Sequence, residues 1–121
     1  MVSLGSHLKI HVPQELRDRA VAFYVGVLGC ERIPSRSDAV DMLRLPDGSV
    51  IGLFSVPSPE ALPEDSCLRS TWLELMCTDV AGLRRRILDA GVREVSYFDK
   101  NHFYFQAPGG QVFRLADESE R

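Results

Sequence analysis

The sequence predicts an α+β fold built from two tandem βαβββ modules. A shift of 62 residues superimposes the two halves of the chain, which is the signature of an internal repeat. The shift places Gly29 on Gly91, Pro46 on Pro108, Gly48 on Gly110 and Leu53 on Leu115. Each half runs from an alternating segment through a segment of helical period to three short alternating segments. With 121 residues, 45% of them hydrophobic and 26% charged, the chain has the composition of one globular domain.

The first module is expected over residues 5–56. Residues 7–12, HLKIHV, alternate polar and apolar side chains as a half-buried strand does. Apolar residues recur at helical spacing from Leu16 to Val27, and Gly29 stands where a C-terminal cap belongs. Strands are expected over 31–36, 39–45 and 50–56, with PDGS as the turn between the last two.

A proline-rich, acidic linker over residues 57–67 separates the first module from the second, which is expected over 68–116. Its first strand covers 70–78, and its helix runs from Asp79, a natural N-cap, to Gly91. Strands near 95–99, 102–106 and 111–116 complete it. Residues 117–121 are expected to form a polar, frayed tail.

Charge and cysteine content exclude several classes of partner. The net charge of −3 gives no reason to expect a nucleic-acid or membrane partner, and no apolar run reaches the roughly 18 residues of a membrane helix. The basic run Arg84–Arg86 has the spacing of a solvated helix face. Three cysteines without CxxC spacing lead us to expect reduced thiols in a cytoplasmic protein.

The segments HLKIHV, AFYVGVLGCE, LRLPDGSVIGLF and FQAPGGQVFRL, taken together, resemble the vicinal oxygen chelate superfamily of glyoxalases, bleomycin-resistance proteins and extradiol dioxygenases. The resemblance covers nearly the whole chain. It implies that the mixed sheets of the two modules curve into a cup, with the helices outside and the ligand within, usually in a homodimer.

Strand alternation assigns side chains to the face of each sheet that would line this cup. Leu8, Ile10 and Val12 form one apolar row, so the polar residues between them point the other way. The same reasoning for the other strands gives the candidate ligand-binding residues His7, Lys9, His11, Met42, Arg44, Trp72, Glu74, Met76, His102, Tyr104 and Arg114.

Metal-dependent members of the superfamily hold their metal with four residues on this face. Carried over by the resemblance, the four positions are His7, Gly52, Trp72 and Arg114, and only His7 can bind a metal. His7 and His11 are about 13 Å apart on one strand, too far for a shared ion. Arg114 carries a permanent positive charge and no available lone pair. We therefore expect no metal or other cofactor, although His7, Glu74 and His102 could form a different metal site.

The sequence thus favours a metal-free protein of the bleomycin-resistance type, which sequesters a flat, partly anionic small molecule against Trp72, Tyr104 and Met76. Arg114 would be the charged anchor in this interpretation, or else the ion-pair partner of Glu74. The alternative is a glyoxalase-like lyase, isomerase or dioxygenase with an atypical site and Glu74 as the candidate base. A regulatory module that binds a partner in the same cup is a third reading.

Overall fold

Each repeat folds into one four-stranded mixed sheet in the computed structural model, which describes all 121 residues. The strand order is β1-β4-β3-β2 in the first sheet and β5-β8-β7-β6 in the second, so the two sheets have the same topology. The first strand of each sheet pairs in parallel with the last, and the other pairs are antiparallel. The strands are β1 (His7–Pro13), β2 (Glu31–Ile33), β3 (Val40–Arg44), β4 (Val50–Val56), β5 (Trp72–Cys77), β6 (Arg93–Glu94), β7 (Phe103–Gln106) and β8 (Val112–Asp117).

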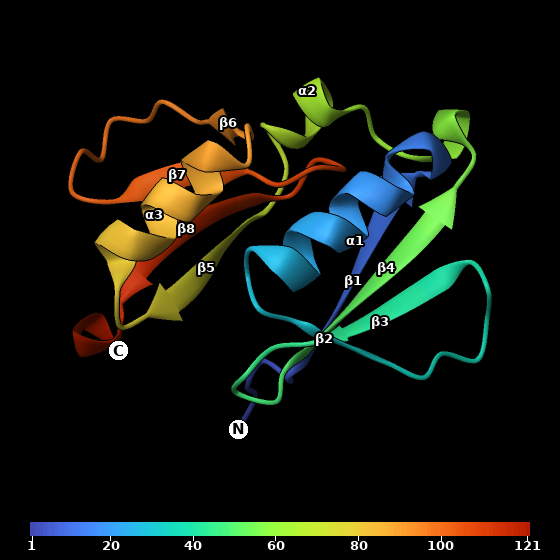
Figure 1. Ribbon diagram of the computed structural model, residues 1–121, viewed down its shortest axis with the longest axis horizontal. Helices are drawn as coiled ribbons and strands as arrows, with labels where there is room; N and C mark the ends of the chain where they lie inside the picture. The colour runs from blue at the N-terminus through green and yellow to red at the C-terminus, as the bar shows by residue number, and fades with distance from the viewer.

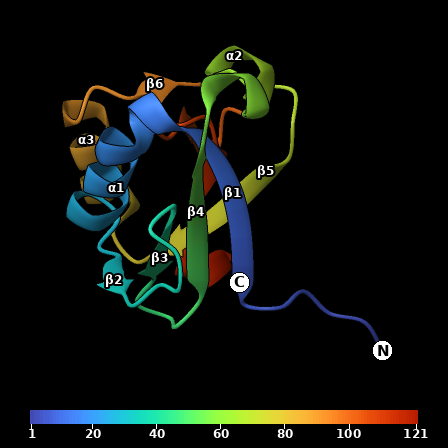
Figure 2. The same cartoon turned by 90° about the vertical axis from the view of Figure 1, so that its right-hand side faces the viewer.

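One helix follows the first strand of each module. Helix α1 (Arg17–Gly26) begins after the short 3-10 helix η1 (Gln14–Leu16), and α3 (Val80–Asp89) begins at Asp79. The Asp79 carboxylate accepts a hydrogen bond from the amide of Gly82 at 2.9 Å, which confirms it as the N-cap. Both helices lie on the same side of the two sheets (Figure 2). None of the helices has the length and apolar character needed to cross a bilayer.

The hydrophobic core fills the space between these helices and the sheets and is shared by both modules. Phe23 and Tyr24 of α1 lie against Phe105 and Phe113 of the second sheet, with ring centroids 5.9 and 6.2 Å apart. The two modules stand side by side in Figure 1, with the linker crossing above them. Because α1 of one module packs on the sheet of the other, neither module has a core of its own.

The linker contains more structure than its composition predicts. It forms a 3-10 helix η2 (Ser58–Glu60) and a single helical turn α2 (Glu64–Cys67). The buried amide of Gln106 donates to the carbonyl of Glu64 at 2.7 Å, and the Glu64 carboxylate accepts from the amide of Gly109 at 3.1 Å. The linker is therefore fastened to the β7–β8 hairpin.

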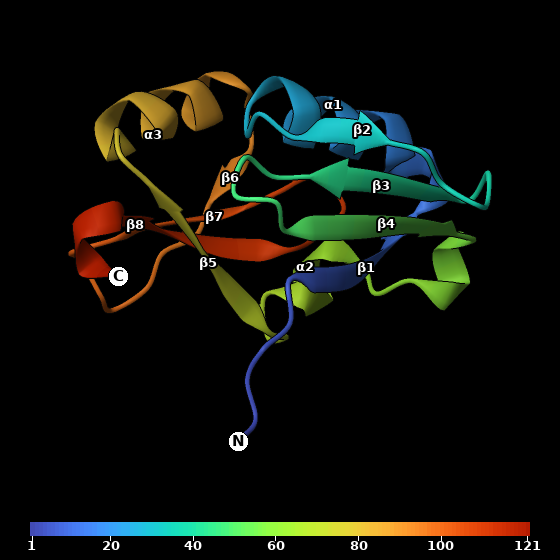
Figure 3. The same ribbon diagram turned by 90° about the horizontal axis from the view of Figure 1, so that it is seen from below.

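Two predicted segments differ from the structure. Residues 95–99 are not a strand, because β6 ends at Glu94 and a loop over residues 95–102 leads to β7 (Figure 3). The C-terminal tail is not frayed, since β8 continues to Asp117 and a 3-10 helix η3 (Glu118–Glu120) follows. A capping box between Asp117 and Glu120 holds this last turn.

Candidate functional site

The sheet face turned away from the helices carries the candidate residues in corresponding rows of the two modules. In the first sheet Arg44, Val50 and His7 form one row, and Met42, Gly52 and Lys9 form the next. In the second sheet Val112 stands beside Trp72, and Tyr104, Arg114 and Glu74 share the following row. In strand register, His7 therefore corresponds to Trp72, Lys9 to Glu74 and Gly52 to Arg114.

Strand β1 places three basic side chains on the first-module face. His7, Lys9 and His11 are exposed, and none of them is in an ion pair. The ammonium group of Lys9 lies 4.4 Å from the centroid of the Phe54 ring, and His11 meets the same ring edge-on at 6.0 Å. Phe54 is thus the centre of this face.

Met42 and Arg44 complete the first-module candidates, and they differ in their surroundings. Met42 is half-buried, and its sulfur lies 3.4 Å from the position that a methyl group at residue 52 would take. Arg44 pairs with Glu31 across β2 and β3 on the exposed surface. Exposed pairs of this kind contribute little to stability, so Arg44 is free to exchange its partner.

An aromatic cluster dominates the second-module face. Tyr97, from the loop after β6, lies 4.9 Å from Trp72 and 5.1 Å from Tyr104 between ring centroids. Trp72 and Tyr104 are 5.5 Å apart, and the Trp72 indole N–H donates to the carbonyl of Leu68 at 3.2 Å. Phe98 extends the cluster toward solvent, with its ring 4.4 Å from Tyr97 and 81% of its surface exposed.

Arg114 is engaged by two carboxylates of its own chain. Its guanidinium donates from Nε to Glu74 at 2.8 Å, and Nη1 lies 3.6 Å from Asp99. Hydrogen bonds to Glu74 and Tyr104 raise the pKa of Arg114, so it stays cationic. The ion pair with Glu74, which the sequence offered as one of two roles for Arg114, is therefore present.

The Asp99 carboxylate accepts hydrogen bonds from the loop and from β7. It accepts from the amide of Asn101 at 2.9 Å, from the Tyr104 hydroxyl at 2.8 Å and from Nδ1 of His102 at 2.7 Å. These hydrogen bonds, that from the Asn101 backbone first, lower the pKa of Asp99 to about 2. Asp99 therefore stays ionised and fastens the loop to the sheet.

His102 stands between two carboxylates. Besides Asp99, its other ring nitrogen, Nε2, meets Glu120 of η3 at 2.6 Å. The bond to Glu120, followed by that to Asp99, raises the pKa of His102. The candidate residue His102 therefore joins the loop to the end of the chain.

Met76 lies apart from the aromatic cluster. It is half-buried on β5, where it borders a groove of 680 Å³ between the two modules. About half of the residues that line the groove are apolar, among them Leu8 and Leu73.

Tyr97, Asp99 and Glu120 are site residues that the sequence reasoning missed. Only Glu120 carried a readable signal, since Asp117 and Glu120 have capping-box spacing.

The residues at the four expected metal positions do not fit a metal. Gly52 offers no ligand atom, Trp72 has no available lone pair, and Arg114 carries a fixed positive charge. The imidazole of His7 is the single possible donor, whereas a bound divalent ion needs at least three. Elsewhere, no three His, Cys, Asp or Glu side chains are grouped so that they could hold an ion.

Several solved structures are similar to this chain over nearly its whole length. One is the fosfomycin resistance protein FosX from Listeria monocytogenes, complexed with Mn(II) and 1S,2S-dihydroxypropylphosphonic acid. It has a TM-score of 0.70 and 19% identity, covering 95% of this chain and 92% of that chain. The FosX protein from Mesorhizobium loti has a TM-score of 0.69 and 13% identity, covering 100% and 98%.

A glyoxalase family protein from Bacillus anthracis has a TM-score of 0.73 and 14% identity, covering 97% of this chain and 96% of that chain. No protein-family model and no curated protein sequence matches the chain. Identities below 20% establish a common architecture and leave the ligand open. This chain therefore has the fold of FosX and glyoxalase-family proteins, the vicinal oxygen chelate fold that its sequence predicts.

Proposed function

We propose that this protein binds a flat, partly anionic small molecule in its sheet cup without a resident metal, as a sequestering protein of the bleomycin-resistance type does. The observation that carries the proposal is the aromatic cluster of Trp72 and Tyr97 with the buried Tyr104, on the sheet face turned away from the helices. Aromatic side chains gathered outside the core beside fixed charges are typical of ligand sites, because they supply contact area and orientation together.

The test is calorimetric titration with a panel of planar aromatic acids and antibiotics. We expect saturable binding at micromolar concentrations for at least one compound, and a loss of about tenfold or more in Trp72→Ala, since one aromatic contact is removed. Trp72→Phe, which keeps a ring at this position, is the matched control and should retain most of the affinity. A panel without a single saturable response would contradict the proposal.

The absence of a resident metal is tested separately. We expect protein purified without chelators to contain no stoichiometric zinc, nickel, iron or manganese, and EDTA to leave ligand affinity unchanged. Stoichiometric metal would favour the alternative function, a glyoxalase-like lyase, isomerase or dioxygenase with an atypical site. In that case Glu74, which pairs with Arg114, is the candidate base to replace first.

The proposal includes a homodimer, which the resemblance to the vicinal oxygen chelate superfamily implies. In each sheet an outer strand, β1 or β5, has one edge without a β partner. Light scattering during gel filtration should give twice the chain mass of 13.5 kDa.

We place the protein in the cytoplasm, since all three cysteines are free thiols.

A further inference from the structure

The charged anchor for the ligand is the point at which the structure departs most from the expected site. Arg114 was expected either to anchor the ligand or to pair with Glu74, and its Nε donates to Glu74 while Nη1 lies 3.6 Å from Asp99. A ligand anion at Arg114 would have to displace a carboxylate that is attached to the protein. Such a carboxylate is present at a high effective concentration, so a free anion competes poorly with it.

The first-module face offers basic side chains without this competition. Lys9 and His7 lie two residues apart on β1, so their side chains share one face of the strand. No carboxylate lies within ion-pair distance of either, and both are exposed. An unpaired lysine beside an unpaired histidine gives several N–H donors to an oxyanion.

Gly52 brings these donors together. A methyl group at residue 52 would lie 3.7 Å from Nε2 of His7 and 3.1 Å from Cε1 of Phe54. With no side chain at this position, the His7 ring and the edge of Phe54 both close over Gly52, which is buried. Lys9 stands over the same Phe54 ring, with Nζ 4.4 Å from the centroid. The imidazole of His7 therefore lies beside the open position at Gly52, and the ammonium group of Lys9 lies over the neighbouring Phe54 ring.

We propose that the surface formed by His7, Lys9 and Phe54 over Gly52 is an oxyanion subsite, which holds the carboxylate or phosphate-type group of the ligand. The subsite lies in the row where metal-dependent relatives place a ligand residue, and it meets the anion directly with N–H donors. The inference rests on the proposed function, because it names the charged end of the molecule whose flat part contacts Trp72.

The test uses the histidine ring signals of the whole protein in NMR titrations with sodium acetate and, separately, with inorganic phosphate, both at constant ionic strength. The sequence has three histidines, His7, His11 and His102, so each Cε1–H signal can be assigned by a single His→Gln variant. We expect the His7 signal to shift saturably with at least one anion, while the His102 signal, already between two carboxylates, stays in place. Response to acetate alone identifies a carboxylate subsite, and response to phosphate identifies a phosphate subsite.

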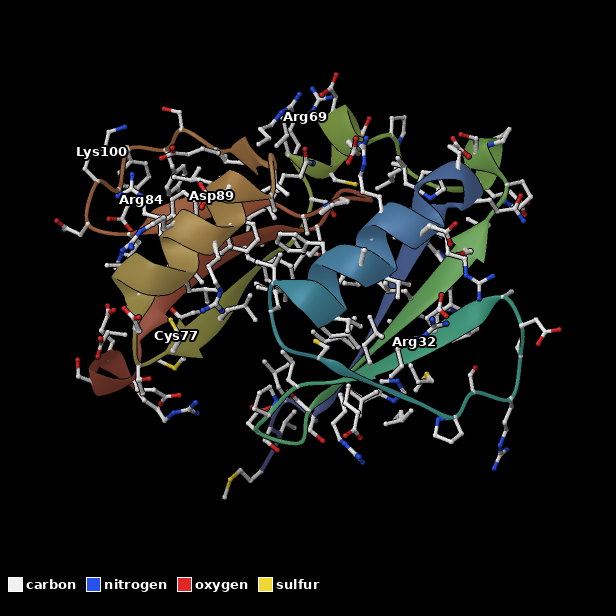
Figure 4. All side chains as sticks on the ribbon, viewed as in Figure 1. Arg32, Arg69, Cys77, Arg84, Asp89 and Lys100 are labelled. Carbon is white, nitrogen blue, oxygen red and sulfur yellow. The ribbon has the colours of Figure 1, made fainter.

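Lysine substitution gives a matched pair, because the chain has only two lysines, Lys9 and Lys100. Lys100 is exposed in the loop at the outer end of the second module (Figure 4). Lys9→Gln should weaken the anion affinity read at His7 by about fivefold or more, and Lys100→Gln should leave it unchanged. Both positions are exposed, so both variants should fold as the wild type does.

The outcomes separate this inference from the proposed function. If aromatic ligands bind in a Trp72-dependent way but Lys9→Gln leaves their affinity and the His7 response unchanged, the subsite is wrong and the proposed function stands. The same conclusion follows if Lys9→Gln weakens only the dimer, because Lys9 would then be a subunit contact. If acetate and phosphate shift His7 in a Lys9-dependent way while no aromatic ligand binds, the subsite holds and the aromatic-ligand proposal fails.

Discussion

Replacement of Gly109 by alanine tests how the second module is joined to the first. Gly109 lies in the β7–β8 turn with a φ of +99°, where an L-residue costs about 1 kcal/mol. A Cβ there would lie 2.7 Å from Cγ1 of Val12, a fully buried residue of β1. Overpacking of this kind costs about 1–3 kcal/mol, so Gly109→Ala should lower the free energy of unfolding by ~2–4 kcal/mol.

The equivalent turn of the first module supplies the control. Gly48 has a similar φ of +92°, and a Cβ at this position would meet no atom within 4 Å. Gly48→Ala should therefore show the backbone cost alone, about 1 kcal/mol. In thermal unfolding followed by circular dichroism, we expect the midpoint to fall by about 10 °C for Gly109→Ala and by about 4 °C for Gly48→Ala. Equal losses in the two variants would show that the contact between Gly109 and Val12 has no energetic weight.

Three further predictions concern the loop, the tail and the buried carboxylate. Tyr97→Ala should expose the indole of Trp72 and shift its fluorescence emission to longer wavelength, at a stability cost of about 1 kcal/mol; an unchanged spectrum would contradict the edge-to-face contact between the two rings. Because the folded pKa of His102 is raised, its stabilising contribution is complete below the unfolded pKa of about 6.5 and is lost as the pH rises through the folded pKa. The protection of the η3 amides from exchange should fall over that range, and Glu120→Gln should make this fall smaller. Burial by itself would raise the pKa of Asp41, but its ion-pair partners Arg17 and Arg32 lower the pKa overall. The contribution of Asp41 to the free energy of unfolding is therefore present above pH ~4 and is lost as the pH falls through the folded pKa. Asp41→Asn should remove this part of the acid sensitivity, and an unaltered acid-unfolding curve would show that the ion pairs are dispensable.

The faces of the strands could be predicted from the sequence because they follow from local alternation. Leu73 and Leu75 pack against the core while Glu74 meets Arg114 on the other side of β5, as the pattern indicates. The repeat also predicts the shared strand order of the two sheets, since corresponding turns begin with Pro46 and Pro108. Period and turn chemistry are local properties, so one sequence is enough to read them.

Contacts between residues that are distant along the chain could not be predicted from local sequence patterns. Val95 and Tyr97 alternate with Ser96 as residues of a strand would, but the loop folds onto the sheet because Tyr97 packs on Trp72, 25 residues earlier. The tail is ordered because Glu120 reaches His102, which is likewise remote in sequence. These two contacts occupy much of the second-module face, and the periodicity of apolar residues does not predict them.

The duplicated architecture separates the chemistry of the face from the integrity of the protein. Alternation along β1 places Val12 in the core and leaves His7, Lys9 and His11 exposed, without a hydrogen bond or an ion pair that the fold requires. Substitutions at these three positions can change charge and shape on the face with little penalty to folding, because exposed positions away from caps and networks usually alter stability by less than about 0.5 kcal/mol. Variants selected for a new ligand should therefore accumulate on β1, while the second module, fastened by Asp99 and its partners, stays constant. These three positions of β1 are free to vary because the core that both modules share is built from other residues.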